Sequence, residues 1–95
     1  MAQTREFRGV ETTITSNAQE GISFIYRGTT VVKVKGAWIT LNSNGWRTAT
    51  TKTRMNQASN QFDLGYSVWQ KNYEWFVSLP NGDTVEYTDG LTFKR

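Results

Sequence analysis

The sequence predicts an α+β fold, in which antiparallel β-strands and hairpins surround one central α-helix at about residues 50–63. Apolar and polar residues alternate with a period of two on both sides of this helix, as they do in half-buried strands. Turn-forming residues, most of them Gly, Asn and Asp, separate the alternating segments. Because 95 residues are enough for one core only, we expect a single domain over residues 1–95, with the first few residues disordered.

Three strands are expected before the helix, at residues 22–26, 32–35 and 37–41. Turn residues at positions 27–29 and at Gly36 separate these strands. The Asn44-Gly45 pair favours a tight turn with positive φ. Residues 46–48 are expected to form a short strand or extended segment after that turn.

Residues 50–63 interrupt the alternation and form the one convincing helical segment. Their apolar positions recur at helical spacing, and polar residues occupy the opposite side. The apolar side consists of Thr51, Met55, Ala58 and Phe62, and the polar side includes Lys52, Asn56 and Asn60. We expect Thr50 or Thr51 to cap the start of the helix, and Gly65 to close its end.

Strand patterns return after the helix, at residues 66–70, 73–77, 84–87 and 91–94. Turns are expected at Lys71-Asn72, at residues 80–83 and at Asp89-Gly90. Aromatic residues are frequent in these strands, and we expect most of them to fill a thin core or an interface between subunits. The other interpretation is a sheet face on which bases stack.

Composition excludes several classes of enzyme. The chain has no Cys and no His, which excludes thiolate metal sites, disulfides and a Ser–His–Asp triad. The eight carboxylates are scattered, and those that are close in sequence are explained by turns and an exposed strand. We therefore expect no catalytic residue, no metal site and no cofactor. With no apolar stretch of transmembrane length, the expected location is the cytoplasm, without membrane contact.

The segment that enters the helix carries charges of unexpected sign. Helix N-termini carry positive partial charge and usually attract acidic residues, but no Asp or Glu occurs between Asn44 and Gln61. Arg47, Lys52 and Arg54 occur there instead, among Thr hydroxyls. A bound phosphate would make this arrangement favourable, and Trp46 could stack on a base. The alternative is that the cations point to solvent and the Thr residues only cap the helix.

We interpret this segment, with the strand that follows it, as a ligand site. The expected ligand-binding residues are Trp46, Arg47, Thr48, Thr50, Thr51, Lys52, Arg54, Asn56, Tyr66 and Gln70. No Walker or GxGxxG pattern is present, so the site does not resemble those phosphate-binding loops.

About the last two thirds of the chain resemble a widespread group of short tailed-phage proteins. The shared motifs are Gly-Trp-Arg-Thr at 45–48, Thr-Thr-Lys at 50–52, Arg-Met-Asn at 54–56, Gln-Lys-Asn at 70–72 with Trp-Phe-Val at 75–77, and Asp-Gly-Leu-Thr-Phe at 89–93. The resemblance implies a phage protein. Phage proteins of this size often counter host defence, and one class, the anti-CBASS sponges, sequesters cyclic oligonucleotides and works as oligomers.

The leading hypothesis is a non-enzymatic phage protein that sequesters a small phosphate-bearing ligand, above all a cyclic nucleotide immune signal, as a homo-oligomer. Two alternatives stay open. One is a protein that binds single-stranded nucleic acid, against which the modest net charge of +3 counts. The other is an inhibitor of a host factor, or a minor virion component, that uses the aromatic hairpin as its contact surface.

Overall fold

The computed structural model describes residues 11–19 and 21–95, and in this part of the chain eight strands and one helix form the predicted α+β fold. The elements before the loop at 42–48 are β1 (Thr12–Asn17), β2 (Gly21–Tyr26), β3 (Thr29–Lys35) and β4 (Trp38–Leu41). The elements after it are α1 (Ala49–Phe62), β5 (Ser67–Lys71), β6 (Glu74–Ser78), β7 (Thr84–Glu86) and β8 (Leu91–Lys94). The N-terminal residues expected to be disordered lie outside the described residues.

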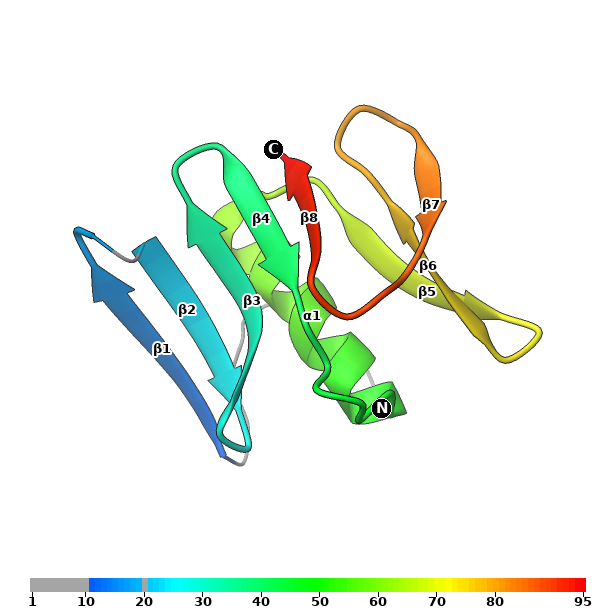
Figure 1. The fold of residues 1–95 in the computed structure, drawn as a ribbon, viewed down its shortest axis with the longest axis horizontal. Coiled ribbons are helices and arrows are strands. Elements are labelled where there is room, and N and C mark those ends of the chain that lie inside the picture. The colour runs from blue at the N-terminus through cyan, green and yellow to red at the C-terminus, as the bar shows by residue number, and fades with distance from the viewer. Residues whose placement is uncertain (1–10, 20) are drawn as a thin grey trace.

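The strands form two antiparallel sheets (Figure 1). The larger sheet has the order β1-β2-β3-β4-β8, and the smaller has the order β5-β6-β7. The chain therefore builds four neighbouring strands, crosses through α1 and the small sheet, and returns with β8 to pair with β4. This return brings the C-terminal segment beside residues far away in sequence.

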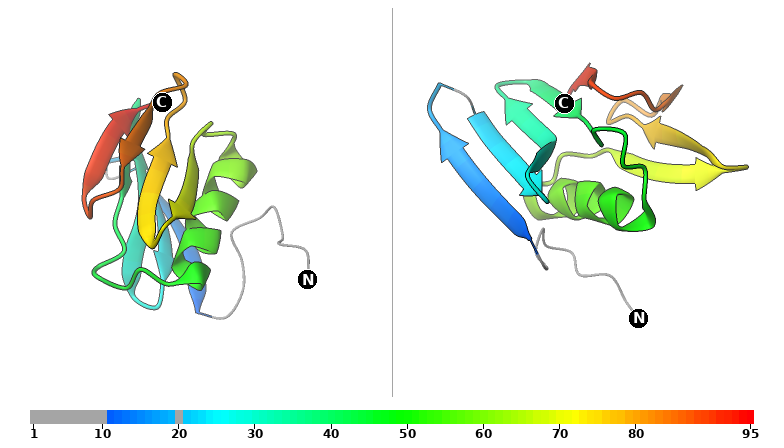
Figure 2. Two further views of the ribbon diagram at one scale, coloured as in Figure 1. Left: turned by 90° about the vertical axis from the view of Figure 1, so that its right-hand side faces the viewer. Right: turned by 60° about the horizontal axis from the view of Figure 1, so that its bottom comes forward.

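One core lies between the two sheets and α1. The helix packs along one face of the five-stranded sheet, as Figure 2 shows, while no described helix or strand covers the opposite face. The buried side chains include Phe24, Val32, Val34, Ile39, Leu41 and Phe93 from the large sheet, Met55 and Ala58 from α1, and Val68, Trp75 and Val77 from the small sheet. The period-two alternation in the sequence thus separates core positions from surface positions.

Both expected helix caps need correction. The N-cap is Thr48, which has an extended backbone and whose side chain accepts a hydrogen bond from the Thr51 backbone, so the helix begins at Ala49. The C-cap is Asp63, which adopts the left-handed conformation with φ of 52°. Gly65 lies two residues beyond this cap. A non-Gly residue ends the helix because Asp tolerates the left-handed region better than most residues.

Several strand boundaries also differ from the expectation; β3, for example, begins at Thr29, which was expected in the preceding turn. Residues 46–48 form no strand, because turn hydrogen bonds run from Trp46 to Ser43 and from Thr48 to Trp46; of the expected extended segment, Thr48 keeps an extended backbone. Tyr73 lies in the turn between β5 and β6 with φ of 67°, so β6 begins at Glu74. Strand β1 was not expected, because its only large apolar residue is Ile14. It forms because β2 offers it a complete pairing edge.

Candidate functional site

A pocket of about 260 Å³ lies where the β2–β3 turn, the loop after β4 and the start of α1 meet. Its lining residues are Tyr26, Arg27, Thr29, Val31, Ser43, Trp46, Thr48 and Thr51. Three of the expected ligand-binding residues, Trp46, Thr48 and Thr51, therefore share one hollow. The Trp46 side chain is 68% exposed and does not fill the core.

The start of α1 borders this pocket with hydroxyl groups. The Thr48 Oγ1 accepts a hydrogen bond from the Thr51 backbone at 3.2 Å and lies 3.0 Å from the Thr51 Oγ1. The first N–H groups of a helix have no partner within the helix, and here they belong to exposed residues that include Thr50. The positive end of the helix dipole therefore lies beside the pocket.

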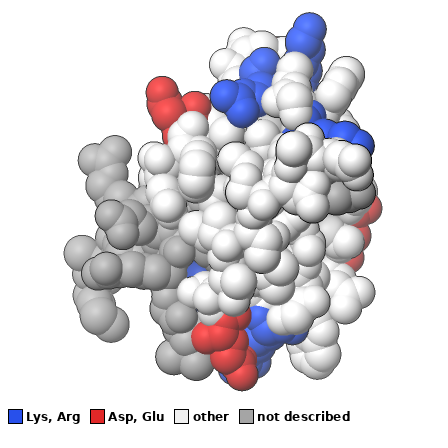
Figure 3. All heavy atoms as spheres, turned by 90° about the vertical axis from the view of Figure 1, so that its left-hand side faces the viewer, with Lys and Arg blue, Asp and Glu red and all other residues white. Residues whose placement is uncertain are grey.

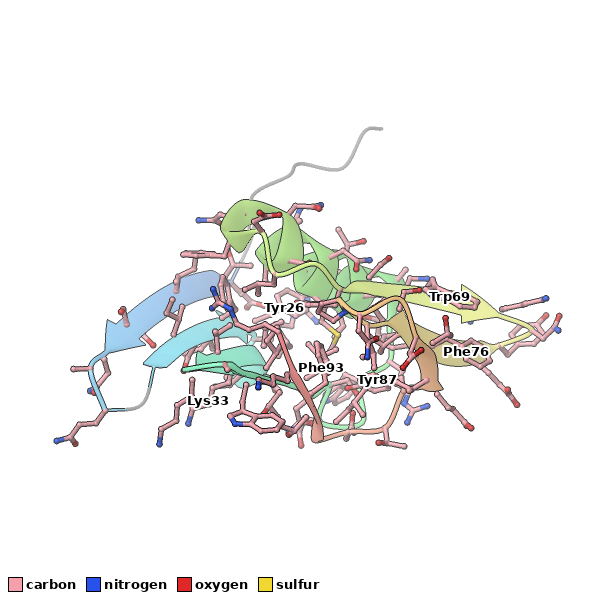
Figure 4. The ribbon with its side chains drawn as sticks, turned by 90° about the horizontal axis from the view of Figure 1, so that it is seen from above. Tyr26, Lys33, Trp69, Phe76, Tyr87 and Phe93 are labelled. Atoms are coloured by element: carbon pink, nitrogen blue, oxygen red, sulfur yellow. The ribbon has the colours of Figure 1, made fainter. Side chains whose placement is uncertain are left out.

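Two guanidinium groups converge on the ring of Tyr26, which lines the pocket and lies on the helix side of the large sheet (Figure 4). Arg27 and Arg54 each place their guanidinium carbon 5.6 Å from the centre of this ring. Arg27 is also paired with Glu11, at 2.8 Å between Nε and Oε2. This pair is exposed, so it neutralises Arg27 only weakly.

Arg54 is held from the helix side. Its Nη1 donates to Gln57 Oε1 at 3.0 Å, and its Nε is buried without a hydrogen-bond partner among the described residues. A buried N–H donor without a partner is unfavourable by about 1–3 kcal/mol. Arg54 was expected at the site. The structure places its guanidinium group against the Tyr26 ring, and Arg54 is not among the residues that line the pocket.

The other two expected cations point elsewhere. Arg47 lies over the ring of Tyr87, with its guanidinium carbon 5.1 Å from the ring centre. The Lys52 Nζ lies 3.5 Å from the Oε1 of Gln70, which was also expected at the site. Arg47, Lys52 and Arg54 therefore do not converge on one point. The cation in the pocket lining is Arg27, which sequence reasoning placed only in a turn.

Asn56 and Tyr66 join α1 to the small sheet. The Asn56 side chain donates to the Val68 carbonyl at 2.9 Å and accepts from the Val68 N–H at 2.7 Å. The Tyr66 hydroxyl donates to the Met55 carbonyl at 2.6 Å, and burial raises the pKa of Tyr66 well above its ordinary value. The structure thus places Tyr66 in the core, as the core interpretation of the aromatic strands expected.

Asp89 fixes the loop that lines the pocket. Its Oδ1 accepts hydrogen bonds from the Ser43 backbone at 3.0 Å, the Ser43 hydroxyl at 2.6 Å and the Tyr87 hydroxyl at 2.7 Å. Its Oδ2 accepts from the Gly45 backbone at 2.9 Å. Burial alone would raise the pKa of Asp89, but these hydrogen bonds outweigh it and lower the pKa to about 2. The sequence signal was an Asp-Gly pair, which indicated a turn and not this long-range role.

The arrangement combines surfaces for rings with groups for anions. Trp46 and Tyr26 offer ring surface, while Arg27, the hydroxyls of Thr48 and Thr51 and the start of α1 offer positive charge and hydrogen bonds. No group of three His, Cys, Asp or Glu that could hold a metal ion occurs among residues 11–19 and 21–95.

The fold and the pocket define a small α+β protein with one helix between two antiparallel sheets. Residues 1–94 match the family model of the Kyanoviridae Gp96 protein. The chain therefore belongs to this family and is a phage protein, as its motifs implied. No curated protein and no solved structure matches it. Within the described residues, no helix has the length and apolar character that a membrane span requires.

Proposed function

We propose that the protein is a non-enzymatic binding protein that captures a small phosphate-bearing ligand with an aromatic ring, namely a nucleotide, in the host cytoplasm. The observation that carries this proposal is the pocket in which Trp46, Arg27 and the start of α1 meet. A planar base would stack on the exposed indole of Trp46. A phosphate would lie toward Arg27 and the Thr48 hydroxyl, at the positive end of the helix.

The size of the pocket restricts the ligand. Its volume of about 260 Å³ lies just below the range of about 300–1,000 Å³ that is usual for ligand pockets. The pocket therefore suits one nucleotide unit, either a nucleoside monophosphate or one half of a cyclic dinucleotide. We propose the second form, in which two subunits of a homo-oligomer would sequester one cyclic signal, because one pocket holds about one nucleotide unit.

The first test is a thermal shift measurement with a panel of cyclic dinucleotides, cyclic mononucleotides, nucleoside monophosphates and inorganic phosphate. A ligand at about tenfold its Kd adds about 1.4 kcal/mol to the free energy of unfolding. For a domain of this length, that corresponds to a rise in Tm of about 6–11 °C. We expect this rise with at least one nucleotide and a much smaller rise with phosphate alone, because phosphate cannot stack on Trp46.

Two variants test whether the pocket is the site. Trp46→Ala and Arg27→Gln should each abolish most of the rise in Tm, because they remove the stacking ring and the pocket cation. Lys71→Gln removes a charge from β5, away from the pocket, and should leave the rise unchanged. The absence of any shift across the panel would overturn the proposal. Recovery of a hydrolysed ligand would overturn its non-enzymatic part, and native mass spectrometry of the complex gives the number of subunits.

A further inference from the structure

The face of the five-stranded sheet that points away from α1, here called the outer face, has an unusual distribution of charge. The strands of this sheet contain no Asp or Glu at any position from Thr12–Asn17, Gly21–Tyr26, Thr29–Lys35, Trp38–Leu41 or Leu91–Lys94. Their charged residues are Lys33, Lys35 and Lys94. The described carboxylates all lie in other elements and loops.

Strand register places these lysines around one exposed aromatic ring. Lys35 pairs with Trp38 across β3 and β4, and Trp38 pairs with Lys94 across β4 and β8. Partners in register point to the same face of a sheet, so the indole lies between two ammonium groups in one row. The Trp38 side chain is 54% exposed.

The neighbouring row continues the same chemistry. Lys33 pairs with Ser23 on β2 and with Thr40 on β4, and Thr40 pairs with Thr92. Figure 4 shows Lys33 on the opposite side of the sheet from Tyr26, so the outer face is separate from the pocket. Figure 3 shows Lys and Arg side chains at the upper end of the molecule, with acidic side chains to one side of them, and Figure 1 places the turn between β3 and β4 at this end.

We propose that the outer face binds single-stranded nucleic acid. Trp38 stacks on an unpaired base, Lys33, Lys35 and Lys94 contact the phosphates around it, and the hydroxyls of the adjacent row offer hydrogen bonds to sugar or phosphate. Charge complementarity selects a polyanion, because the charged residues within the five strands of this sheet are all lysines. The exposed indole selects a strand whose bases are free to stack, since the bases of a duplex are already stacked on one another.

The number of lysines sets the expected strength and salt dependence of binding. Each phosphate contacted on a single strand contributes about −0.7 to the slope of log K against log salt concentration, so three contacts give a slope of about −2. Affinity should then fall about 20-fold between about 50 and 200 mM salt. Such binding is moderate and tolerant of sequence, in keeping with the small excess of positive charge on the whole chain.

The test is a fluorescence anisotropy titration of the full chain against a labelled oligo-dT of about 15 nucleotides, a length that covers known site sizes. Trp38→Ala should weaken binding about five- to 150-fold, as loss of one stacked base does. The double variant Lys35→Gln/Lys94→Gln should reduce the magnitude of the salt slope by about 1.4. Far-UV circular dichroism checks that both variants are folded.

Two matched controls carry the same changes elsewhere. Tyr73→Ala removes an aromatic side chain that is 95% exposed in the β5–β6 turn, and Lys71→Gln removes a lysine from β5; both should bind the oligonucleotide like the parent chain. Three results would each overturn the proposal. They are unchanged binding by Trp38→Ala, equal affinity for a duplex of the same length, and the absence of binding at about 50 mM salt. Sedimentation gives the oligomeric state of the parent chain and of Trp38→Ala. If the parent chain is a dimer and Trp38→Ala is a monomer, the outer face binds a second copy of the chain and the proposal is wrong.

Discussion

At the scale of single residues, Asp89 has the largest role in shaping the pocket. Its carboxylate gathers two backbone N–H groups and two hydroxyls from the loop after β4 and from Tyr87. Hydrogen bonds to an ionised acceptor are stronger than those between neutral groups. The loop that carries Trp46 is therefore tied to the segment between β7 and β8.

This residue predicts a pH dependence of stability. The folded-state pKa of Asp89, about 2, lies below the ordinary 3.8, so the carboxylate contributes stability above about pH 4, and this contribution is lost as the pH falls toward 2. Asp89→Asn should lower the free energy of unfolding by about 1 kcal/mol at neutral pH, after allowance for solvent screening of an exposed carboxylate. The difference between the two proteins should shrink in urea denaturation near pH 2.5, within the window that the pKa defines.

Glu86→Gln is the matched control, since it removes an exposed carboxylate from β7. It should leave the pH dependence close to that of the parent chain. If Asp89→Asn unfolds with the same midpoint as the parent chain at every pH, the loop is not held by this carboxylate.

At the scale of elements, Asn56 joins the helix to an edge strand. Strand β5 pairs with β6 on one side only, so its other edge leaves N–H and C=O groups without a strand partner. The Asn56 amide satisfies both groups of Val68, because it carries a donor and an acceptor at one tip. This explains why a polar residue on the expected solvent side of α1 is partly buried.

Asn56→Ala should therefore destabilise the fold by about 2 kcal/mol, because it leaves the buried Val68 backbone without partners. Asn60→Ala, an exposed position four residues further along α1, should change the free energy of unfolding by less than about 0.5 kcal/mol. Urea denaturation of the three proteins measures the difference. Equal stability of the two variants would show that the helix is held on β5 by apolar packing alone.

At the scale of the whole molecule, the two sheets and the helix share one core. The buried cluster includes Ile39 from β4, Met55 from α1 and Trp75 from β6. Neither sheet has an apolar cluster of its own in the described part of the chain, so one sheet cannot lose its packing without exposing the other. Unfolding should accordingly be a single cooperative transition.

Ile39→Val tests this cooperativity. The change removes one methylene from a fully buried side chain in the large sheet and should lower the free energy of unfolding by about 1 kcal/mol. Far-UV circular dichroism and tryptophan fluorescence, whose change comes mainly from buried Trp75 in the small sheet, should shift to the same new urea midpoint. A fluorescence midpoint that stays in place would show that the sheets unfold separately.

The elements of this fold were predictable where their signals are local. Alternation and helical spacing depend on neighbours a few residues away, and they identified α1 and most strands. Strand β1 was not predicted, because an exposed edge strand needs few apolar residues. Its only large apolar residue is Ile14. The N-cap was misplaced by two to three residues, although the helix itself begins within one residue of the expected start, because Thr48, Thr50 and Thr51 are equally good caps in sequence and only the backbone conformation distinguishes them.

The candidate site was predictable in part for the same reason. Trp46, Thr48 and Thr51 lie within six residues of one another, and the turn and cap that place them are local. Their partners Tyr26, at the end of β2, and Arg27, in the β2–β3 turn, come from about twenty residues earlier, and Asp89 comes from more than forty residues later. Pairing between distant segments depends on how the sheets pack, which no short-range pattern encodes.

The sequence by itself determined the α+β class, the position of the helix, the scarcity of groups for acid–base or thiol chemistry, and the run without acidic residues that enters the helix. Only the tertiary structure decided which cation joins the pocket, which carboxylate holds its loop and which lysines surround Trp38. The physical reason is that secondary structure follows from contacts along the chain, whereas β8 reaches β4, and Asp89 reaches Ser43, only after the core has closed between them.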